Sequence, residues 1–171
     1  LRFDPTRDGR MPMVLAAAAQ LRREYPQADI RVPMAGPFTV VCLLMDMEEA
    51  ICGLVGDPVA MVAALTHLAE NMLCYARAAQ AIGCGVTIYE SAVTPPLLSP
   101  QLFTQHVLPV LTMIVDAVAA GSPGDTQLII GGDNLPIVDA IVSTGAAYII
   151  CPMETDQAAF LARVPPSARM Q

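Results

Sequence analysis

Acidic side chains that follow short apolar segments give this sequence its clearest potential for acid–base chemistry. Glu90 ends a β-branched and aromatic segment, and Asp133 and Glu154 each come just after an apolar one. Loops that follow the strands of a parallel β/α fold present such groups to substrate. Asp133 and Asp156 also precede expected helices, where a carboxylate can accept from the free N–H groups of the first turn. Catalysis and helix capping are therefore both open for these carboxylates.

The elements that would position these side chains follow from apolar periodicity and from turn residues. Four strands are predicted at residues 29–35, 86–90, 127–130 and 147–151. Helices are predicted at residues 12–25, 40–47, 48–55, 57–83, 99–121, 134–144 and 155–163, with a turn at residues 36–39, a bend at Pro109 and a frayed tail at residues 165–171. The starts of the helices at residues 57–83 and 99–121 rest on the pairs Asp57-Pro58 and Ser99-Pro100, an N-cap oxygen followed by a proline.

The alternation of strands and helices predicts an α/β fold with a parallel sheet. Each strand is a continuous apolar run, and no hairpin dipeptide joins two of them. A glycine-rich dinucleotide fingerprint is absent, and Gly131-Gly132 is the nearest candidate. We therefore expect a single domain over residues 1–171 that is part of a parallel β/α barrel of the TIM type. A complete barrel takes roughly 250 residues.

Composition and charge exclude several classes of function. The formal net charge is −7 and the chain contains no Lys, so nucleic acid is not an expected partner. Without Lys there is neither a Schiff-base lysine nor a phosphate-binding lysine of the Walker type. The most apolar stretches are each interrupted before the roughly 20 residues that a membrane span needs, so no membrane contact is expected. Five scattered cysteines indicate reduced thiols and a cytoplasmic location.

A series of short motifs resembles the uroporphyrinogen decarboxylase superfamily, which includes cobamide-dependent methyltransferases. The series runs from about Ile30 to about Phe160 and comprises Gly36-Pro37-Phe38-Thr39, Asp57-Pro58, Tyr89-Glu90-Ser91, the segment 98–103, Pro109 and Gly131-Gly132. The resemblance implies a β/α barrel whose active site opens at the carboxyl ends of the strands. It also implies that these residues are the middle and later units of that barrel, without its N-terminal portion.

The resemblance and the positions of the strand ends together select the candidate site residues. Catalytic or substrate-facing roles are expected for Glu90, Ser91 and Asp133. Contacts with substrate or corrinoid are expected at Phe38, Thr39, Tyr89, Gly131, Gly132 and Glu154. His67 and His106 have no metal-ligating residue three or four positions away, so structural or surface roles are expected for them and no metal site is predicted.

The methyltransferase branch of the superfamily resembles this sequence more closely than the decarboxylases do. Its zinc-binding members carry His and Cys where this chain has Ile129 and Gly131, so no zinc is expected. The resemblance then implies zinc-free, corrinoid-dependent methyl transfer from a methylated small molecule, similar to the glycine betaine group. Cobalamin or another corrinoid would be the cofactor, and a corrinoid protein a possible partner.

Two alternatives remain open. The first is uroporphyrinogen III decarboxylation, which needs no cofactor and takes a tetrapyrrole ligand. Against it, the family's Tyr corresponds to Leu43, and only Arg31, Arg77 and Arg163 lie between residues 30 and 164. The second is a non-catalytic partial barrel that acts in a homo-oligomer or another interaction, because the exposed edges of an unfinished sheet invite pairing.

Overall fold

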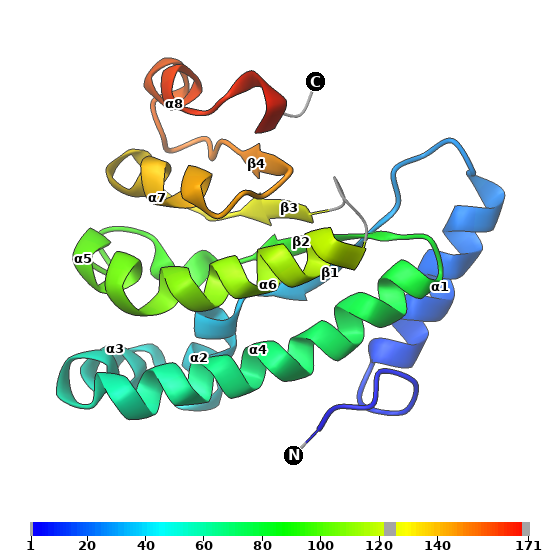
Figure 1. The fold of residues 1–171 in the computed structure, drawn as a ribbon, viewed down its shortest axis with the longest axis horizontal. Helices are drawn as coiled ribbons and strands as arrows, with labels where there is room; N and C mark the ends of the chain where they lie inside the picture. The colour runs from blue at the N-terminus through cyan, green and yellow to red at the C-terminus, as the bar shows by residue number, and fades with distance from the viewer. Residues whose placement is uncertain (1, 122–125, 169–171) are drawn as a thin grey trace.

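The computed structural model describes residues 2–121 and 126–168, which form an α/β fold around a parallel sheet (Figure 1). The strands are β1 (Arg31–Ala35), β2 (Gly85–Tyr89), β3 (Thr126–Ile129) and β4 (Tyr148–Ile150). The α-helices are α1 (Met11–Glu24), α2 (Pro37–Leu44), α3 (Met47–Gly56), α4 (Pro58–Ala81), α5 (Pro100–Leu102), α6 (Leu108–Gly121), α7 (Val138–Ser143) and α8 (Gln157–Arg163). Shorter helical segments are η1 (Ser91–Val93), the π-helical η2 (Phe103–Val107), η3 (Leu135–Ile137) and η4 (Pro166–Ala168).

The predicted strands and helices are present, whereas the predicted turn and part of the predicted frayed tail differ from the structure. Residues 36–39, predicted as a turn, are instead the start of α2, with Gly36 at the N-cap and Pro37 at the first helical position. Of the predicted frayed tail, residues 166–168 form η4, and residues 169–171 lie outside the described residues.

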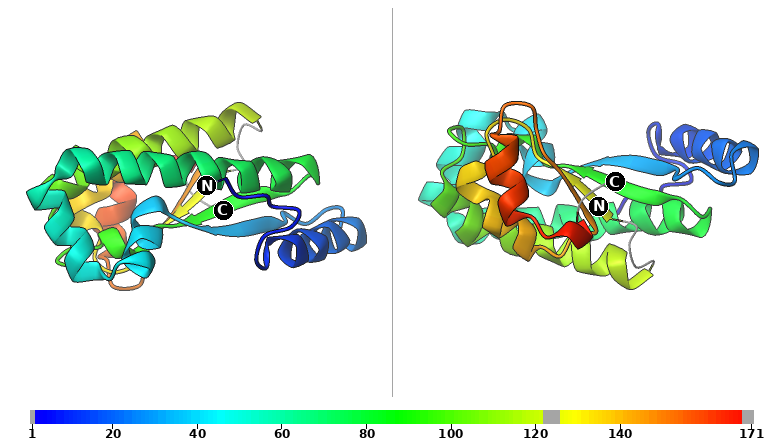
Figure 2. Two further views of the ribbon diagram at one scale, coloured as in Figure 1. Left: turned by 90° about the horizontal axis from the view of Figure 1, so that it is seen from below. Right: turned by 90° about the horizontal axis from the view of Figure 1, so that it is seen from above.

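The sheet has the strand order β1-β2-β3-β4, and every neighbouring pair is parallel. Successive parallel strands joined by helices give the arrangement of a β/α barrel over part of its circumference. The long helices α4 and α6 pack against each other. Figure 2 shows them side by side over one face of the sheet. The expectation of a partial parallel barrel is confirmed.

The face of the sheet beneath the helices carries the hydrophobic core. Val86, Ile88, Leu128 and Ile149 share this face and are buried. α4 packs against β1 and β2, and α6 packs against β3. Removing a side chain of this size from water is worth roughly 1.5–3 kcal/mol. Helix packing against one face of the sheet therefore supplies much of the stability of the fold.

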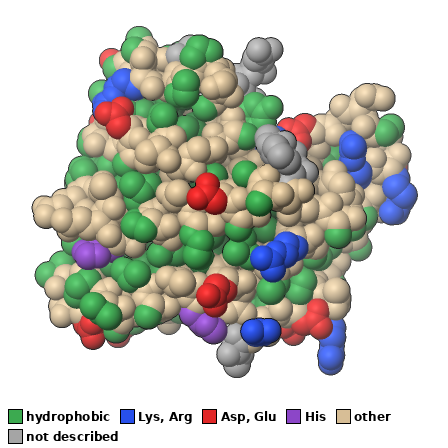
Figure 3. All heavy atoms as spheres, viewed as in Figure 1, with side chains coloured by type: hydrophobic (Ala, Val, Ile, Leu, Met, Phe, Trp, Pro, Cys, Tyr) green, Lys and Arg blue, Asp and Glu red, His purple; other side chains and the backbone are tan. Residues whose placement is uncertain are grey.

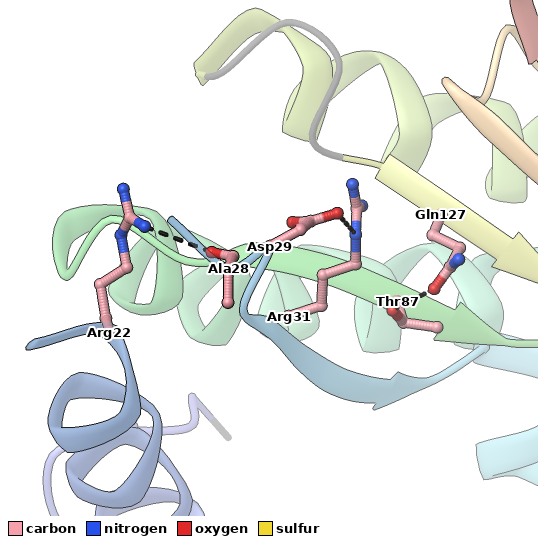
Figure 4. Close-up of polar contacts among 6 residues, drawn as sticks. All are labelled: Arg22, Ala28, Asp29, Arg31, Thr87 and Gln127. Atoms are coloured by element: carbon pink, nitrogen blue, oxygen red, sulfur yellow. Dashed lines mark hydrogen bonds and ion pairs between the residues drawn. The ribbon is translucent and has the colours of Figure 1, made fainter. Parts of the chain in front are cut away.

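The opposite face carries a polar row that would line the interior of a barrel. The strand register places Pro33, Thr87, Gln127 and Tyr148 side by side on this face. The Thr87 hydroxyl donates to Gln127 Oε1 at 2.8 Å, as Figure 4 shows. The Arg31 guanidinium lies 5.0 Å from the Tyr148 ring centroid, so a side chain of β1 reaches one of β4 across this face.

The outer edge of β1 is interrupted by proline. The N–H of Gly36 donates to Tyr89 and Ile30 accepts from Gly85, so the even-numbered residues of this strand bond to β2. The odd-numbered residues, Pro33 among them, face the free edge. Because proline has no N–H, a strand added at this edge would find one carbonyl oxygen without a donor.

Within the part of the chain that the structure describes, two helices are long and apolar enough, by length and composition alone, to cross a membrane. They are α4 and the continuous helical segment 100–121, whose most apolar windows are 44% and 39% buried in the structure. Both contribute fully buried side chains to the core, including Leu65 and Ile114. Both helices therefore pack with one face against the sheet.

Candidate functional site

The candidate site lies where the four strands end. Because the strands are parallel, their carboxyl ends meet at one edge of the sheet. Gly36 follows β1, Glu90 and Ser91 follow β2, and Asp133 and Glu154 lie in the loops after β3 and β4. The edge therefore gathers the residues that the sequence selected as a candidate site.

Glu90 is the centre of this edge and is fully buried. Its Oε2 accepts from the backbone N–H of Phe38 at 3.1 Å, and its Oε1 accepts from the backbone N–H of Thr39 at 2.8 Å. The Thr39 hydroxyl donates to the same Oε1 at 2.6 Å. These N–H groups belong to the first turn of α2, which has no partner for them within the helix. Glu90 thus caps α2 from the neighbouring strand.

Gly36 is required by this arrangement. A Cβ atom at position 36 would lie 2.3 Å from Glu90 Oε2, 2.4 Å from its Cδ and 2.8 Å from its Cβ. The carboxylate could shift, but the Cβ of Glu90 is fixed to the strand backbone. Each residue of Gly36-Pro37-Phe38-Thr39 therefore has a local purpose: space for the carboxylate, a preset first helical residue and three hydrogen-bond donors.

Burial sets the protonation of Glu90. Removal from water raises the pKa of Glu90 to about 7, and the hydrogen bonds from Thr39 and Phe38 oppose that rise. Cys42 lies one helical turn further along α2, and burial, followed by the charges of Glu90 and Asp46, raises the pKa of its thiol to about 11. Cys42 is therefore a protonated thiol at neutral pH and does not suit a nucleophilic role.

Threonine side chains tie the strand-end loops to one another. The Thr39 hydroxyl accepts from the N–H of Ala92 at 3.2 Å, which links α2 to the loop after β2. The Thr94 hydroxyl lies 2.6 Å from the carbonyl oxygen of Gly131 and 3.0 Å from that of Ser91. The loops after β1, β2 and β3 are thereby connected.

Gly132 and Thr94 form the tightest contact of this network. Gly132 has a φ of +71°, in the region that favours glycine, and a Cβ there would lie 2.1 Å from Thr94 Cγ2. Glycine is needed at this position for both reasons. The expected ligand contacts Gly131 and Gly132 are half-buried, and each gives its carbonyl oxygen to a threonine hydroxyl.

Asn134 and Thr155 connect the loops after β3 and β4. The Thr155 hydroxyl donates to the Gly132 carbonyl at 3.0 Å and accepts from the Asn134 N–H at 2.8 Å. The Asn134 amide donates to the Ile130 carbonyl at 2.7 Å. Sequence reasoning missed Asn134, Thr155 and Thr94. Their only signal is a hydrogen-bonding side chain in a strand-end loop, which many loop residues share.

The remaining predicted site residues fall into an exposed group and a buried group. Tyr89, Ser91, Asp133 and Glu154 are exposed at the edge, with Tyr89 at 41%. Phe38, like Glu90, has no exposed surface, so its side chain belongs to the core and its backbone N–H serves the cap. Four side chains can therefore reach a ligand from the solvent side, and the buried carboxylate lies beneath them.

The structure also resolves the capping alternatives for the two aspartates. Asp133 Oδ1 accepts from the N–H of Leu135 at 3.1 Å, and Asp156 Oδ1 accepts from the N–H of Ala159 at 3.0 Å. Asp156 therefore caps α8, whereas Asp133 closes a local turn just before η3, whose N-cap residue is Asn134. Both side chains remain exposed at the edge.

The charge of this edge is negative. Asp133, Glu154 and Asp156 are exposed in the loops after β3 and β4. Within residues 2–121 and 126–168, no Arg lies in the loops that directly follow the four strands. In the same residues, no group of three or more His, Cys, Asp or Glu side chains is placed to hold a metal ion. His67 and His106 lie on α4 and in η2.

Comparison with known proteins places this geometry in a family. The sequence model of the family described as Uroporphyrinogen decarboxylase (URO-D) matches residues 2–164. A similar solved structure is a methyltransferase from Methanosarcina mazei, with a TM-score of 0.74 and 24% sequence identity over 84% of this chain. The chain spans 42% of that protein's length. A search of the curated proteins found no match.

Proposed function

We propose that this chain, which belongs to the uroporphyrinogen decarboxylase family, is part of a β/α barrel that moves a methyl group from a methylated small molecule to a corrinoid. The family match confirms the resemblance drawn from the motifs. The structural neighbour is a methyltransferase, and the proposal extends that activity to this chain. The observation that carries the choice within the family is the negative charge at the carboxyl edge.

The negative charge of the edge favours methyl transfer over decarboxylation. A porphyrinogen substrate carries several carboxylates, which proteins usually hold with Arg or Lys. The described strand-end loops offer neither, and they expose Asp133, Glu154 and Asp156 instead. An anionic tetrapyrrole would be repelled here, whereas a neutral or cationic methyl donor would not.

The exposed side chains suit a methylated ammonium group. Tyr89 presents its ring at the end of β2, and aromatic faces attract quaternary ammonium ions by roughly 0.5–2 kcal/mol. The Ser91 hydroxyl can hydrogen-bond a polar group of the donor. Asp133 and Glu154 add attraction for positive charge. Holding the donor in one orientation would be the chief contribution of these residues to the rate.

Glu90 would act here as a positioning residue. Its full burial keeps it from touching the donor, while its bonds to α2 fix the backbone on which Thr39 lies. Thr39 in turn holds Ala92, the residue after Ser91. The buried carboxylate thus sets the place of the loop that carries Ser91.

The described residues do not fit a corrinoid held by this chain alone. A protein ligand to cobalt would be a neutral histidine, and neither His67 nor His106 lies in a strand-end loop. We therefore assign the corrinoid, which supplies the methyl acceptor, to a separate protein. The residues of this chain bind and orient the methyl donor.

A spectroscopic assay tests the proposal. Purified protein is mixed with reduced cobalamin, which stands in for the corrinoid of the separate protein. Quaternary amines, methanol and aryl ethers are added in turn, and methylcobalamin is followed by its visible spectrum. We expect turnover with a quaternary amine and a loss of roughly two- to thirtyfold in Tyr89→Ala. Tyr25→Ala is the matched control, because Tyr25 is 57% exposed at the end of α1, away from the strand ends. No spectral change with any donor would refute methyl transfer, and release of CO₂ from a porphyrinogen would replace it with decarboxylation.

A further inference from the structure

An apolar groove lies between α2, α3 and α4, apart from the residues assigned to the methyl donor. We call it the α2–α4 groove. It has a volume of about 470 Å³ and is lined chiefly by Val41, Leu44, Met45, Met61, Ala64 and Leu68. Asp57 and His67 are the polar residues in its lining. A cavity of this size with so few polar groups favours an apolar occupant.

The apolar surface continues beyond the groove. Leu43, Leu44, Val55 and Val59 are between 68% and 80% exposed, and they lie at the adjoining ends of α2, α3 and α4. In Figure 3 hydrophobic side chains gather over the end of the molecule where α3 meets α4. A small molecule in the groove would leave these side chains in water, so a larger partner fits better.

The surroundings of the groove are acidic. Residues 32–76, which contain α2, α3 and most of α4, carry no Arg or Lys, and their charged residues are Asp46, Glu48, Glu49, Asp57 and Glu70. Asp57 lines the groove itself, and Asp46 follows its lining residue Met45. A second copy of this chain would bring a second acidic rim against the first, which is unfavourable.

We propose that the α2–α4 groove binds an amphipathic helix of another protein, with an apolar stripe that enters the groove and basic residues that face its acidic rim. Grooves between helices commonly bind the apolar face of a partner helix. The flexible Met45 and Met61 side chains can adjust to such a face. The acidic rim selects the charge of the partner. This inference does not depend on methyl transfer.

Synthetic peptides test the proposal directly. The probe is a fluorescent peptide of roughly 18 residues with leucines at helical spacing and lysines beside them, and its partner probe has glutamates in place of the lysines. We expect the basic peptide to bind the purified protein and become helical, and the acidic peptide not to bind. Raising the salt from about 0.1 M to about 1 M should weaken binding, because charges are then screened within about 3 Å.

Surface variants localise the binding. Leu44→Gln and Val59→Gln change exposed side chains without changing charge, and each should weaken the basic peptide about tenfold. Met13→Gln, at a 63% exposed position on α1, is the matched control and should bind as wild type does. Thermal unfolding checks that each variant is folded. Equal binding of both peptides, or of Leu44→Gln and wild type, would overturn the proposal. So would a dimer that Leu44→Gln dissociates, or uptake of an apolar dye without peptide binding.

Discussion

Glu90 should make the stability of this protein fall as the pH rises through the slightly acidic range. Its carboxyl loses its proton near 4.5 when exposed, but burial raises the pKa to about 7 in the folded protein. Between these values the folded state binds more protons than the unfolded state, so the free energy of unfolding decreases with pH. The stabilisation is complete below about pH 4.5 and lost above about pH 7. This interval corresponds to roughly 3 kcal/mol.

The substitution Glu90→Gln isolates this contribution. The amide cannot ionise, so the variant should lack the decline between pH 4.5 and 7. It also loses one of the two acceptor oxygens that serve Phe38 and Thr39, which should cost roughly 1–3 kcal/mol at every pH. Urea unfolding at several pH values measures both effects. Between pH 4.5 and pH 7, the free energy of unfolding of the variant should rise by roughly 3 kcal/mol relative to that of wild type.

Asp139→Asn provides the control for the loss of one carboxylate. Its hydrogen bond to Arg163 lowers the pKa of Asp139 below its ordinary value of 3.8. A depressed pKa adds stability that is lost only as the pH falls below the ordinary value. The difference in unfolding free energy between this variant and wild type should therefore be constant from pH 5 to 8. If the Glu90→Gln curve also runs parallel to that of wild type, Glu90 does not titrate as its burial requires, and the reasoning is wrong.

Substitutions at Gly36 and Gly132, each with a comparison variant, test the packing of the strand-end loops by urea unfolding. Gly36→Ala should destabilise the fold by roughly 1–3 kcal/mol, because its Cβ would overlap Glu90, whereas Gly56→Ala, with no atom within 4 Å of its Cβ, should change stability by less than about 1 kcal/mol. Equal effects of the two would show that position 36 is not crowded. Gly132→Ala should be destabilising for both its positive φ and its contact with Thr94, and adding Thr94→Ser should recover the part due to the methyl contact. Absence of any recovery would mean that only the backbone conformation matters.

Local signals in the sequence predicted the helix starts and the helix distortion that depend on short-range interactions. Asp57 caps α4 by accepting from the N–H of Ala60 at 3.0 Å, and Ser99 caps α5 by accepting from Leu102 at 3.2 Å. Pro109 was expected to disturb its helix. The structure places the disturbance just before it, where the N–H of Leu108 bonds to Phe103 in the wider π-helical pattern. Residues within one or two turns are sufficient to set these features.

The start of α2 could not be predicted because its cap comes from elsewhere in the chain. Gly36 offers no side-chain acceptor, and the donors of the first turn are served by Glu90, 52 residues beyond Phe38. Sequence spacing carries no information about such a contact until the strands are paired. Pairing of β1 with β2 places Gly36 against Tyr89, and Glu90, the residue that follows β2, then meets the helix.

The parallel pairing of the strands also explains why Glu90, at a strand end, is a catalytic candidate in the sequence. The sequence places Glu90, Asp133 and Glu154 after strands, and the structure confirms that all three lie at one edge. Burial then separates them, because Gly36 leaves room for Glu90 to turn inward, while Asp133 and Glu154 remain in solvent. An acid with its three donors already in place stabilises a loop, and an acid with a free oxygen can meet a ligand. The chemistry of this edge therefore depends on the exposed residues, and Glu90 helps to fix the positions of the loops that carry them.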